Sequence, residues 1–171
     1  DSYRIIETID VDMMKIGQQR IGKMEVLVVD PVAEYARLME SLFDFPKIRA
    51  LFANGFRMRF DAMCAVTGPY ATEILENRLG AAPGTVTHGT PLPDFGGMHP
   101  DPNPTWAHEL MGEMMGPDAP DFGAASDGDG DRNMVSNIHA RGTPPAEAAK
   151  RLAVLVGAML ATTMSANVFF W

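Results

Sequence analysis

Apolar and polar residues follow two different periods along the chain, and the change of period predicts strands that alternate with helices. Residues 24–29, with the sequence Met-Glu-Val-Leu-Val-Val, form a β-rich run that predicts a strand. Residues 33–43 instead carry apolar side chains at helical spacing, after Asp30 as a helix cap and Pro31 as a first-turn residue. The apolar positions of this predicted helix are Tyr35, Leu38, Met39 and Leu42.

The same alternation continues through the middle of the chain. A short helix is predicted after Pro46. Residues 56–63 alternate apolar and charged side chains before they become apolar, which is typical of a strand whose end enters a core. A helix is predicted from Thr67 to about Leu79, where Gly80 ends it. A strand followed closely by a helix is the βα unit of open sheets.

The next stretch leads to an acidic loop. Residues 86–88 predict a short strand, and residues 91–104 form a loop rich in proline and glycine. A helix is predicted from Thr105, as its cap, to about Met115. Its expected buried face consists of Trp106, Leu110, Met111 and Met114, with the methionines, Met115 included, as core filler. Residues 122–126 then predict a small-residue strand, and ligands of open α/β sheets bind beyond the carboxyl ends of such strands.

These elements predict an α/β fold with a mixed open β-sheet flanked by helices. The chain has 171 residues, of which 46% are hydrophobic and 21% charged, and this composition suits one globular domain with a real core. We expect residues 1–137 to form that domain and residues 138–171 to form an apolar helical tail or the start of a following domain. Residues 3–6 and 134–137 are further candidates for short strands.

The run from Leu152 to Trp171 carries no charge, so a transmembrane span has to be considered. Polar residues interrupt the run, at Thr162, Thr163, Ser165 and Asn167. The sequence therefore favours a buried helix, predicted from about residue 143 to residue 160, followed by an apolar tail. This tail is also a candidate surface for self-association.

The charge balance limits the partners. The formal net charge of -8 argues against nucleic acid or an anionic membrane surface as a general partner. Cys64 is the single cysteine, which fits a reducing cytoplasm, and its apolar neighbours predict a buried, inert thiol.

Three carboxylates, those of Asp127, Asp129 and Asp131, alternate with glycines just after the last of these strands. Their repulsion is unfavourable unless a cation lies between them, and the glycines let the backbone curl so that the carboxylates converge. Oxygen ligands suit a hard divalent cation, and so few protein ligands leave room for water or a phosphate oxygen, which favours magnesium. Arg132 follows at once and suits that phosphate, because a guanidinium can bind an oxyanion through two nitrogens.

Two other interpretations of this loop have to be weighed. One is a solvated acidic turn, since Asp-Gly pairs are common in turns. The other is a calcium-binding EF-hand, because the three aspartates occupy its first, third and fifth positions. An EF-hand needs glycine at the sixth position and glutamate at the twelfth, where this chain has Arg132 and Ile138, so that interpretation fails.

Further motifs accompany the acidic loop in a definite order. They lie at residues 28–32 (Val-Val-Asp-Pro-Val), 43–45 (Phe-Asp-Phe), 59–63 (Arg-Phe-Asp-Ala-Met), 66–70 (Val-Thr-Gly-Pro-Tyr), 94–97 (Asp-Phe-Gly-Gly), 99–103 (His-Pro-Asp-Pro-Asn) and 125–134. The series resembles the second, metal-binding domain of the phosphoglucomutase branch of the α-D-phosphohexomutase family. The resemblance extends from about residue 1 to residue 134.

The resemblance implies a role for each residue of the loop. In that family the aspartates that match Asp127, Asp129 and Asp131 bind magnesium, whose next ligand is a phosphate oxygen on an active-site phosphoserine. The arginine that matches Arg132 helps to hold the phosphate. The reaction interconverts glucose 1-phosphate and glucose 6-phosphate through a glucose 1,6-bisphosphate intermediate.

Departures from the family pattern limit what the chain is expected to do. The family's catalytic serine lies in a Thr-Ala-Ser-His-Asn-type loop, which this sequence lacks, and its sugar-selecting and phosphate-binding loops belong to other domains. Cys64 stands where close relatives have histidine. We therefore expect a mutase domain that is inactive alone and whose partners are the remaining mutase domains. The chief alternative is a stand-alone, metal-dependent binding module; a phosphatase with an aspartate nucleophile has only the acidic loop in its favour. We expect His99 to order its loop through a hydrogen bond and not to bind the metal.

Overall fold

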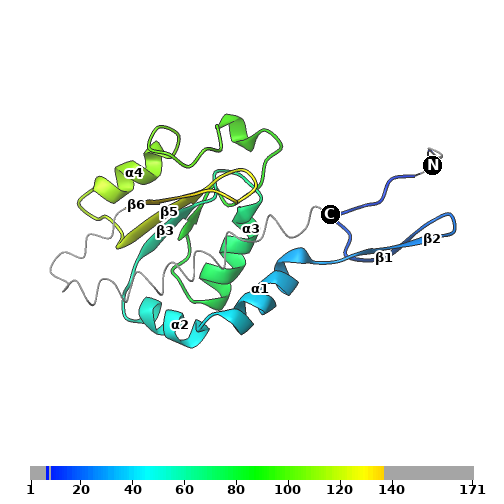
Figure 1. Cartoon of the computed structure of the whole chain (residues 1–171), viewed down its shortest axis with the longest axis horizontal. Helices are drawn as coiled ribbons and strands as arrows, with labels where there is room; N and C mark the ends of the chain where they lie inside the picture. The colour runs from blue at the N-terminus through cyan, green and yellow to red at the C-terminus, as the bar shows by residue number, and fades with distance from the viewer. Residues whose placement is uncertain (1–6, 8, 137–171) are drawn as a thin grey trace.

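The computed structural model describes residue 7 and residues 9–136, which form a two-stranded hairpin and an α/β body (Figure 1). The hairpin consists of β1 (Gly17–Ile21) and β2 (Met24–Val28). The helical elements of the body are α1 (Pro31–Leu42), α2 (Phe45–Ala53), α3 (Thr67–Ala71), the π-helical η1 (Thr72–Arg78), the 3₁₀ turn η2 (Phe95–Gly97) and α4 (His108–Met115). Its strands are β3 (Met58–Asp61), β4 (Val86–Thr87), β5 (Phe122–Ser126) and β6 (Asn133–Ser136).

The body is built on one mixed, open sheet with the strand order β4-β3-β5-β6. β3 runs parallel to both neighbours, so that Asp61 lies beside Thr87 of β4 and Ala125 of β5. β6 returns antiparallel to β5, with Asn133 opposite Ser126. The predicted α/β class and the mixed open sheet are thus confirmed.

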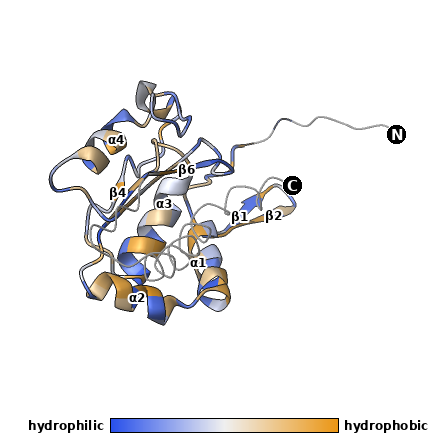
Figure 2. Ribbon diagram, turned by 60° about the vertical axis from the view of Figure 1, so that its left-hand side comes forward, coloured by the Kyte–Doolittle hydropathy of each residue, from blue (hydrophilic) through white to orange (hydrophobic). Residues whose placement is uncertain are grey.

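Helices cover both faces of this sheet. Apolar side chains of α1, α2 and η1 pack on one face in the larger core, together with Phe60 of β3 and Phe122 of β5. α4 packs on the other face, where Leu110 and Met114 meet Ala125 in a smaller core. Figure 2 shows hydrophobic colours interspersed with hydrophilic ones along α1 and α2. The two cores fix β5, and therefore the start of the acidic loop, from both sides.

Aspartate caps set the starts of the first two helices, as the sequence predicts for α1. The Asp30 carboxylate accepts hydrogen bonds from the backbone N–H groups of Val32 and Ala33, at 3.0 and 3.2 Å. Asp44 accepts from Lys47 N–H at 3.1 Å. These bonds satisfy donors that the first helical turn leaves free.

The prediction for the helix before β5 is partly wrong. α4 begins at His108, because the side chain of Asn103 accepts hydrogen bonds from the N–H groups of Thr105 and Trp106 and holds those residues in a preceding turn. Trp106 is 47% exposed and Met115 is 78% exposed. Contrary to the prediction, neither side chain belongs to the core.

The hairpin is the element that the sequence pattern misses. β2 is close to the predicted strand, whereas β1, with the sequence Gly-Gln-Gln-Arg-Ile, has no apolar alternation to announce it. The two strands pair antiparallel from Gly17 opposite Val28 to Ile21 opposite Met24. The hairpin projects from the body (Figure 1), with hydrophilic colours on β1 and more hydrophobic ones on β2 (Figure 2).

Several predictions fall outside the described residues. They are the candidate strand at residues 3–6, the helix at 143–160, the apolar tail and the domain boundary at residue 137. Within residue 7 and residues 9–136, no helix has the length and apolar character needed to cross a membrane.

α3 and η1 together occupy the predicted helix from Thr67 to Leu79, and two backbones meet closely at its start. A Cβ added to Gly68 would overlap the carbonyl group of Gly89 and lie 2.8 Å from its Cα. Only a glycine lets the first turn of α3 approach the segment after β4 so closely. This contact draws α3 against the end of β4.

We expect Gly68→Ala to destabilise the domain by about 2 kcal/mol or more, because the methyl group meets backbone atoms that cannot rotate away. Gly112→Ala is the matched control, since Gly112 lies in α4 with no atom within 4 Å of the added Cβ. That change should stabilise by up to about 1 kcal/mol through helix propensity. Urea unfolding measures both, and equal midpoints for the two variants would contradict the backbone contact.

Candidate metal centre

The acidic loop is a tight connection between two antiparallel strands at the carboxyl end of β5. Asn133 pairs with Ser126, and the N–H of Asp127 donates to the carbonyl of Arg132 at 3.1 Å, so the loop is closed at its base. Gly130 has φ of +81°, a value that residues with a Cβ rarely adopt. All five residues of β5 are buried, which fixes the point where the loop begins.

The loop brings together the three aspartates that the sequence predicts as metal ligands. One carboxylate oxygen from each of Asp127, Asp129 and Asp131 lies within 4.8 Å of the others. Asp127 is buried, with 2% of its surface exposed, whereas the other two are exposed. A buried anchor and two outer carboxylates fit a hard divalent cation that also binds solvent or a phosphate oxygen on its open side.

The carboxylates perturb one another as closely spaced negative groups should. A hydrogen bond with Asp127, partial desolvation and the charges of Asp127 and Asp129 raise the pKa of Asp131. Burial opposes ionisation of Asp127, but hydrogen bonds from Arg132 N–H, Asp131 and the Arg132 guanidinium outweigh it and lower the pKa of Asp127. A cation among the three groups would favour the ionised form of each carboxylate.

Arg132, the predicted phosphate contact, lies beside the cluster. Its backbone N–H donates to Asp127 Oδ1 at 3.0 Å and its Nε donates to Asp127 Oδ2 at 2.9 Å. Its Nη1 lies 3.2 Å from Asp101 Oδ1, and its Nε lies 3.7 Å from Asp131 Oδ1. The side chain is 64% exposed, so the guanidinium stands at the surface between carboxylates.

A hollow of about 520 Å³ opens over the cluster. It is lined by Phe95, His99, Pro100, Asp101, Asp127, Gly128, Asp129 and Arg132. The proline-rich segment 91–104 therefore forms one wall and the acidic loop the other. Phe95 lies over Gly128, where a Cβ would be 3.4 Å from its ring. The hollow joins the carboxylate cluster, a candidate cation site, to an arginine, which is an arrangement suited to a phosphorylated ligand.

His99 lines this hollow without a side-chain hydrogen bond to any described residue. Its ring packs edge to face on Trp106, with the centroids 4.8 Å apart. The side chain thus orders the loop through an aromatic contact, where the sequence suggested a hydrogen bond.

Asp61, His88 and Glu109 form a polar cluster at the same edge of the sheet, which the sequence does not reveal. Asp61, which is 3% exposed, accepts a hydrogen bond from Met63 N–H at 2.8 Å and lies 2.9 Å from His88 Nδ1. Nε2 of His88 lies 3.5 Å from Glu109. The three polar residues are 21 or more positions apart, so only the position of Asp61 at a strand end hints at them.

Residues with strained backbone conformations lie beside the cluster of Asp61, His88 and Glu109. Met63, Cys64, His88 and Phe95 are the non-glycine residues with positive φ among those described, with values from +48° to +54°. All four follow β3 or β4, at the edge that carries the three aspartates of the acidic loop. Such outliers persist only where surrounding contacts hold them.

Cys64 is buried, as predicted. Burial, followed by the charges of Asp61 and Asp94, raises the pKa of its thiol. A raised pKa disfavours the thiolate, so this cysteine is not suited to act as a nucleophile.

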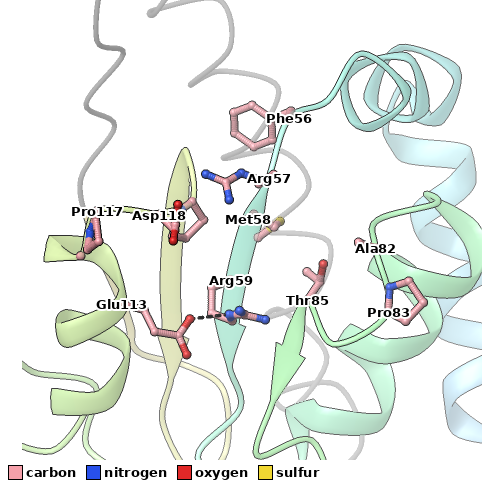
Figure 3. A pocket seen from close by; sticks show the side chains of 12 residues that line it. Phe56, Arg57, Met58, Arg59, Ala82, Pro83, Thr85, Glu113, Pro117 and Asp118 are labelled. Carbon is pink, nitrogen blue, oxygen red and sulfur yellow. Dashed lines mark hydrogen bonds and ion pairs between the residues drawn. The ribbon is translucent and has the colours of Figure 1, made fainter.

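A second pocket lies at the opposite edge of the sheet, between the start of β3 and the end of α4 (Figure 3). It measures about 450 Å³ and contains two arginines. Arg59 Nε is paired with Glu113 at 2.6 Å, and Arg57 Nη2 donates to the carbonyl of Ala119 at 2.7 Å. Arg59 thus ties β3 to α4, and Arg57, just before β3, is tied to the segment between α4 and β5.

Comparisons with known proteins agree with the geometry. Residues 33–139 match the family described as phosphoglucomutase/phosphomannomutase, alpha/beta/alpha domain II. The chain is 62% identical over 135 residues to a phosphoglucomutase of Rhizobium radiobacter, an alignment that covers 79% of this chain and 25% of that protein. It is 52% identical over 133 residues to a chloroplastic phosphoglucomutase of Solanum tuberosum, covering 77% of this chain and 21% of that protein.

A solved structure is similar as well. The open form of pp63/parafusin, a phosphoglucomutase from Paramecium, superposes with a TM-score of 0.69 and 42% sequence identity. The match covers 75% of this chain and 25% of that one. The chain therefore spans about a quarter of the length of the proteins it resembles.

Ser126, the residue just before the three aspartates, shares a buried hydroxyl–hydroxyl hydrogen bond with Thr67. Thr67 Oγ1 and Ser126 Oγ lie 2.6 Å apart, and both residues are 0% exposed. We expect Thr67→Val to destabilise the domain by about 1–3 kcal/mol, because it leaves the Ser126 hydroxyl without that partner. The double variant Thr67→Val/Ser126→Ala should recover part of the loss. Unfolding free energies from a double-mutant cycle measure the coupling, and strictly additive losses would contradict it.

Proposed function

Because the chain belongs to the phosphoglucomutase/phosphomannomutase family, of which it carries the second α/β/α domain, we propose that it is the magnesium-binding domain of a phosphoglucomutase. The observation that carries the proposal is the convergence of the Asp127, Asp129 and Asp131 carboxylates within 4.8 Å at the carboxyl end of β5. The high identity with a bacterial phosphoglucomutase favours glucose phosphates as the substrates.

The proposed reaction interconverts glucose 1-phosphate and glucose 6-phosphate. A phosphoserine on another domain gives its phosphoryl group to the sugar, glucose 1,6-bisphosphate turns over in the site, and the second phosphate returns to the serine. Magnesium supplies a Lewis acid that neutralises charge on the transferring phosphoryl group.

Each residue of the loop has a part in this proposal. Asp127, Asp129 and Asp131 hold the cation, with buried Asp127 as the fixed member of the set. Arg132 binds the phosphate: its Nε and Nη1 are paired with carboxylates, whereas its Nη2 has no hydrogen bond with a described residue. A guanidinium held in place delivers its charge to an oxyanion without further ordering.

The remaining parts of the active site are proposed to come from other domains. The chain matches about a quarter of its relatives' length, and it contains no Thr-Ala-Ser-His-Asn-type loop. A surface for these domains is offered by the β1–β2 hairpin, where Met24 and Leu27 are 57% and 67% exposed. An isolated two-stranded hairpin is marginally stable in water, so contact with a further domain would support it.

Two further expectations complete the proposal. Residues 152–171 are a candidate surface either for those domains or for self-association. We propose the cytoplasm as the location, because the single cysteine suits a reducing compartment, although the potato relative's name places that protein in chloroplasts.

We expect calorimetric titration with MgCl₂ to show weak, saturable binding that disappears in Asp129→Asn. Binding should be weak because the phosphate that would complete the coordination is supplied by another domain. Asp118→Asn is the matched control, since it removes the same charge at the opposite edge of the sheet (Figure 3). Equal binding by wild type and Asp129→Asn would remove the metal assignment.

A mutase assay on the purified chain, with magnesium and a trace of glucose 1,6-bisphosphate, should show no conversion of glucose 1-phosphate. The physical reason is that this sequence lacks the family's serine loop, so no serine is in place to carry the phosphoryl group. Measurable isomerisation would overturn the view that other domains are needed. Magnesium binding without a role in phosphoryl transfer would instead leave a stand-alone binding module.

A further inference from the structure

We propose that Asp101 is a positioning residue, which orients Arg132 toward the phosphorylated ligand of the cation site. The inference rests on the proposed function and deepens it, because it concerns how the phosphate-binding guanidinium is held. Its basis is a contact between two loops: Asp101 Oδ1, in the proline-rich segment, lies 3.2 Å from Arg132 Nη1, in the acidic loop.

Arg132 needs such support because it is a long, exposed side chain. At 64% exposure it can adopt many rotamers in the absence of contacts, and the entropy lost in ordering it opposes binding. The hydrogen bond from its Nε to Asp127 fixes one nitrogen, about which the guanidinium can still pivot. The contact of Nη1 with Asp101 fixes a second nitrogen and with it the plane of the group.

Asp101 is itself held rigidly. Its Oδ2 accepts a hydrogen bond from Asn103 Nδ2 at 2.6 Å, and its carbonyl accepts one from Asn103 N–H at 2.8 Å. Asn103 is anchored in turn, because its Oδ1 accepts from the N–H groups of Thr105 and Trp106 just before α4. The chain of hydrogen bonds connects the guanidinium of Arg132 to a helix that is packed on the sheet.

The two anchors of Arg132 differ in one important respect. Asp127 belongs to the carboxylate cluster, so its oxygens are shared between the arginine and any bound cation. Asp101 lies outside that cluster and has no such competitor. It can hold the guanidinium in the same orientation whether or not the cation is present, while Nη2, which has no hydrogen bond with a described residue, stays available to the phosphate.

The sign of the effect separates positioning from simple electrostatics. Removing the Asp101 charge lowers the repulsion felt by an incoming phosphate, so electrostatics alone predicts tighter binding. Loss of positioning predicts weaker binding. Exposed ion pairs are worth up to about 1 kcal/mol, which corresponds to about a fivefold loss of affinity.

The test compares wild type, Asp101→Asn and the control Asp118→Asn, which removes the same charge at the far edge of the sheet. Each is titrated with MgCl₂ and then, at saturating magnesium, with methyl phosphate as a phosphomonoester probe. Exchange of the Arg132 Nε–H with water, assigned through its loss in Arg132→Lys, is followed by NMR in parallel. In Asp101→Asn we expect up to about fivefold weaker methyl phosphate binding, faster Nε–H exchange and unchanged magnesium affinity. The control should match wild type in all three.

Three results would overturn the inference. They are unchanged or tighter methyl phosphate binding by Asp101→Asn, Nε–H exchange equal to that of wild type, and a parallel loss of magnesium affinity, which would show that Asp101 supports the whole loop. Failure of wild type to bind magnesium would count against the proposed function instead. The exchange measurement would still decide the role of Asp101, because it needs no ligand.

Discussion

A buried, ionised aspartate is the constraint on which the rest of this structure depends. Asp127 is almost fully buried, and an unpaired carboxylate in such a place would cost several kcal/mol. The chain compensates within five residues: Arg132 turns back so that its backbone and its side chain both donate to the same carboxylate. This return requires the tight glycine-containing loop and the antiparallel strand that follows it. The pairing of β5 with β6 and the convergence of the three carboxylates therefore have one cause.

The sheet order then decides what surrounds that aspartate. β3 lies between β4 and β5, so the segments that follow β3 and β4 meet the acidic loop at one edge. The proline-rich wall of the hollow comes from the segment after β4, which begins beside the close approach of Gly68 to Gly89 and is also held by the bond from Leu92 N–H to the carbonyl of Cys64. In the arginine pocket at the other edge, Arg59 is paired with Glu113 and Arg57 with the carbonyl of Ala119, so these cations serve contacts within the fold.

Much of this arrangement could be predicted from the sequence because its signals are local. Asp30 before Pro31 marks a helix start, and the small residues of β5 lead directly into the aspartates. The features that the sequence did not predict depend instead on contacts between segments that are distant in the chain or on competing turns. β1 forms because β2 offers it an edge, so its polar sequence carries no pattern of its own. Trp106 is exposed because Asn103 captures the turn before it, and the contact between Asp61 and His88 exists only once β3 and β4 are paired.

The left-handed residues after β3 and β4 have a consequence for how this domain tolerates change. Each such conformation costs roughly 1–2 kcal/mol in a residue other than glycine, and four of them gather at one edge. The two apolar cores supply the surplus stability that keeps this edge in place. A mutation that weakens either core should therefore loosen this strained edge before the rest of the body unfolds. Substitutions in the core can therefore affect the site through the stability of the fold, although few side chains belong to both.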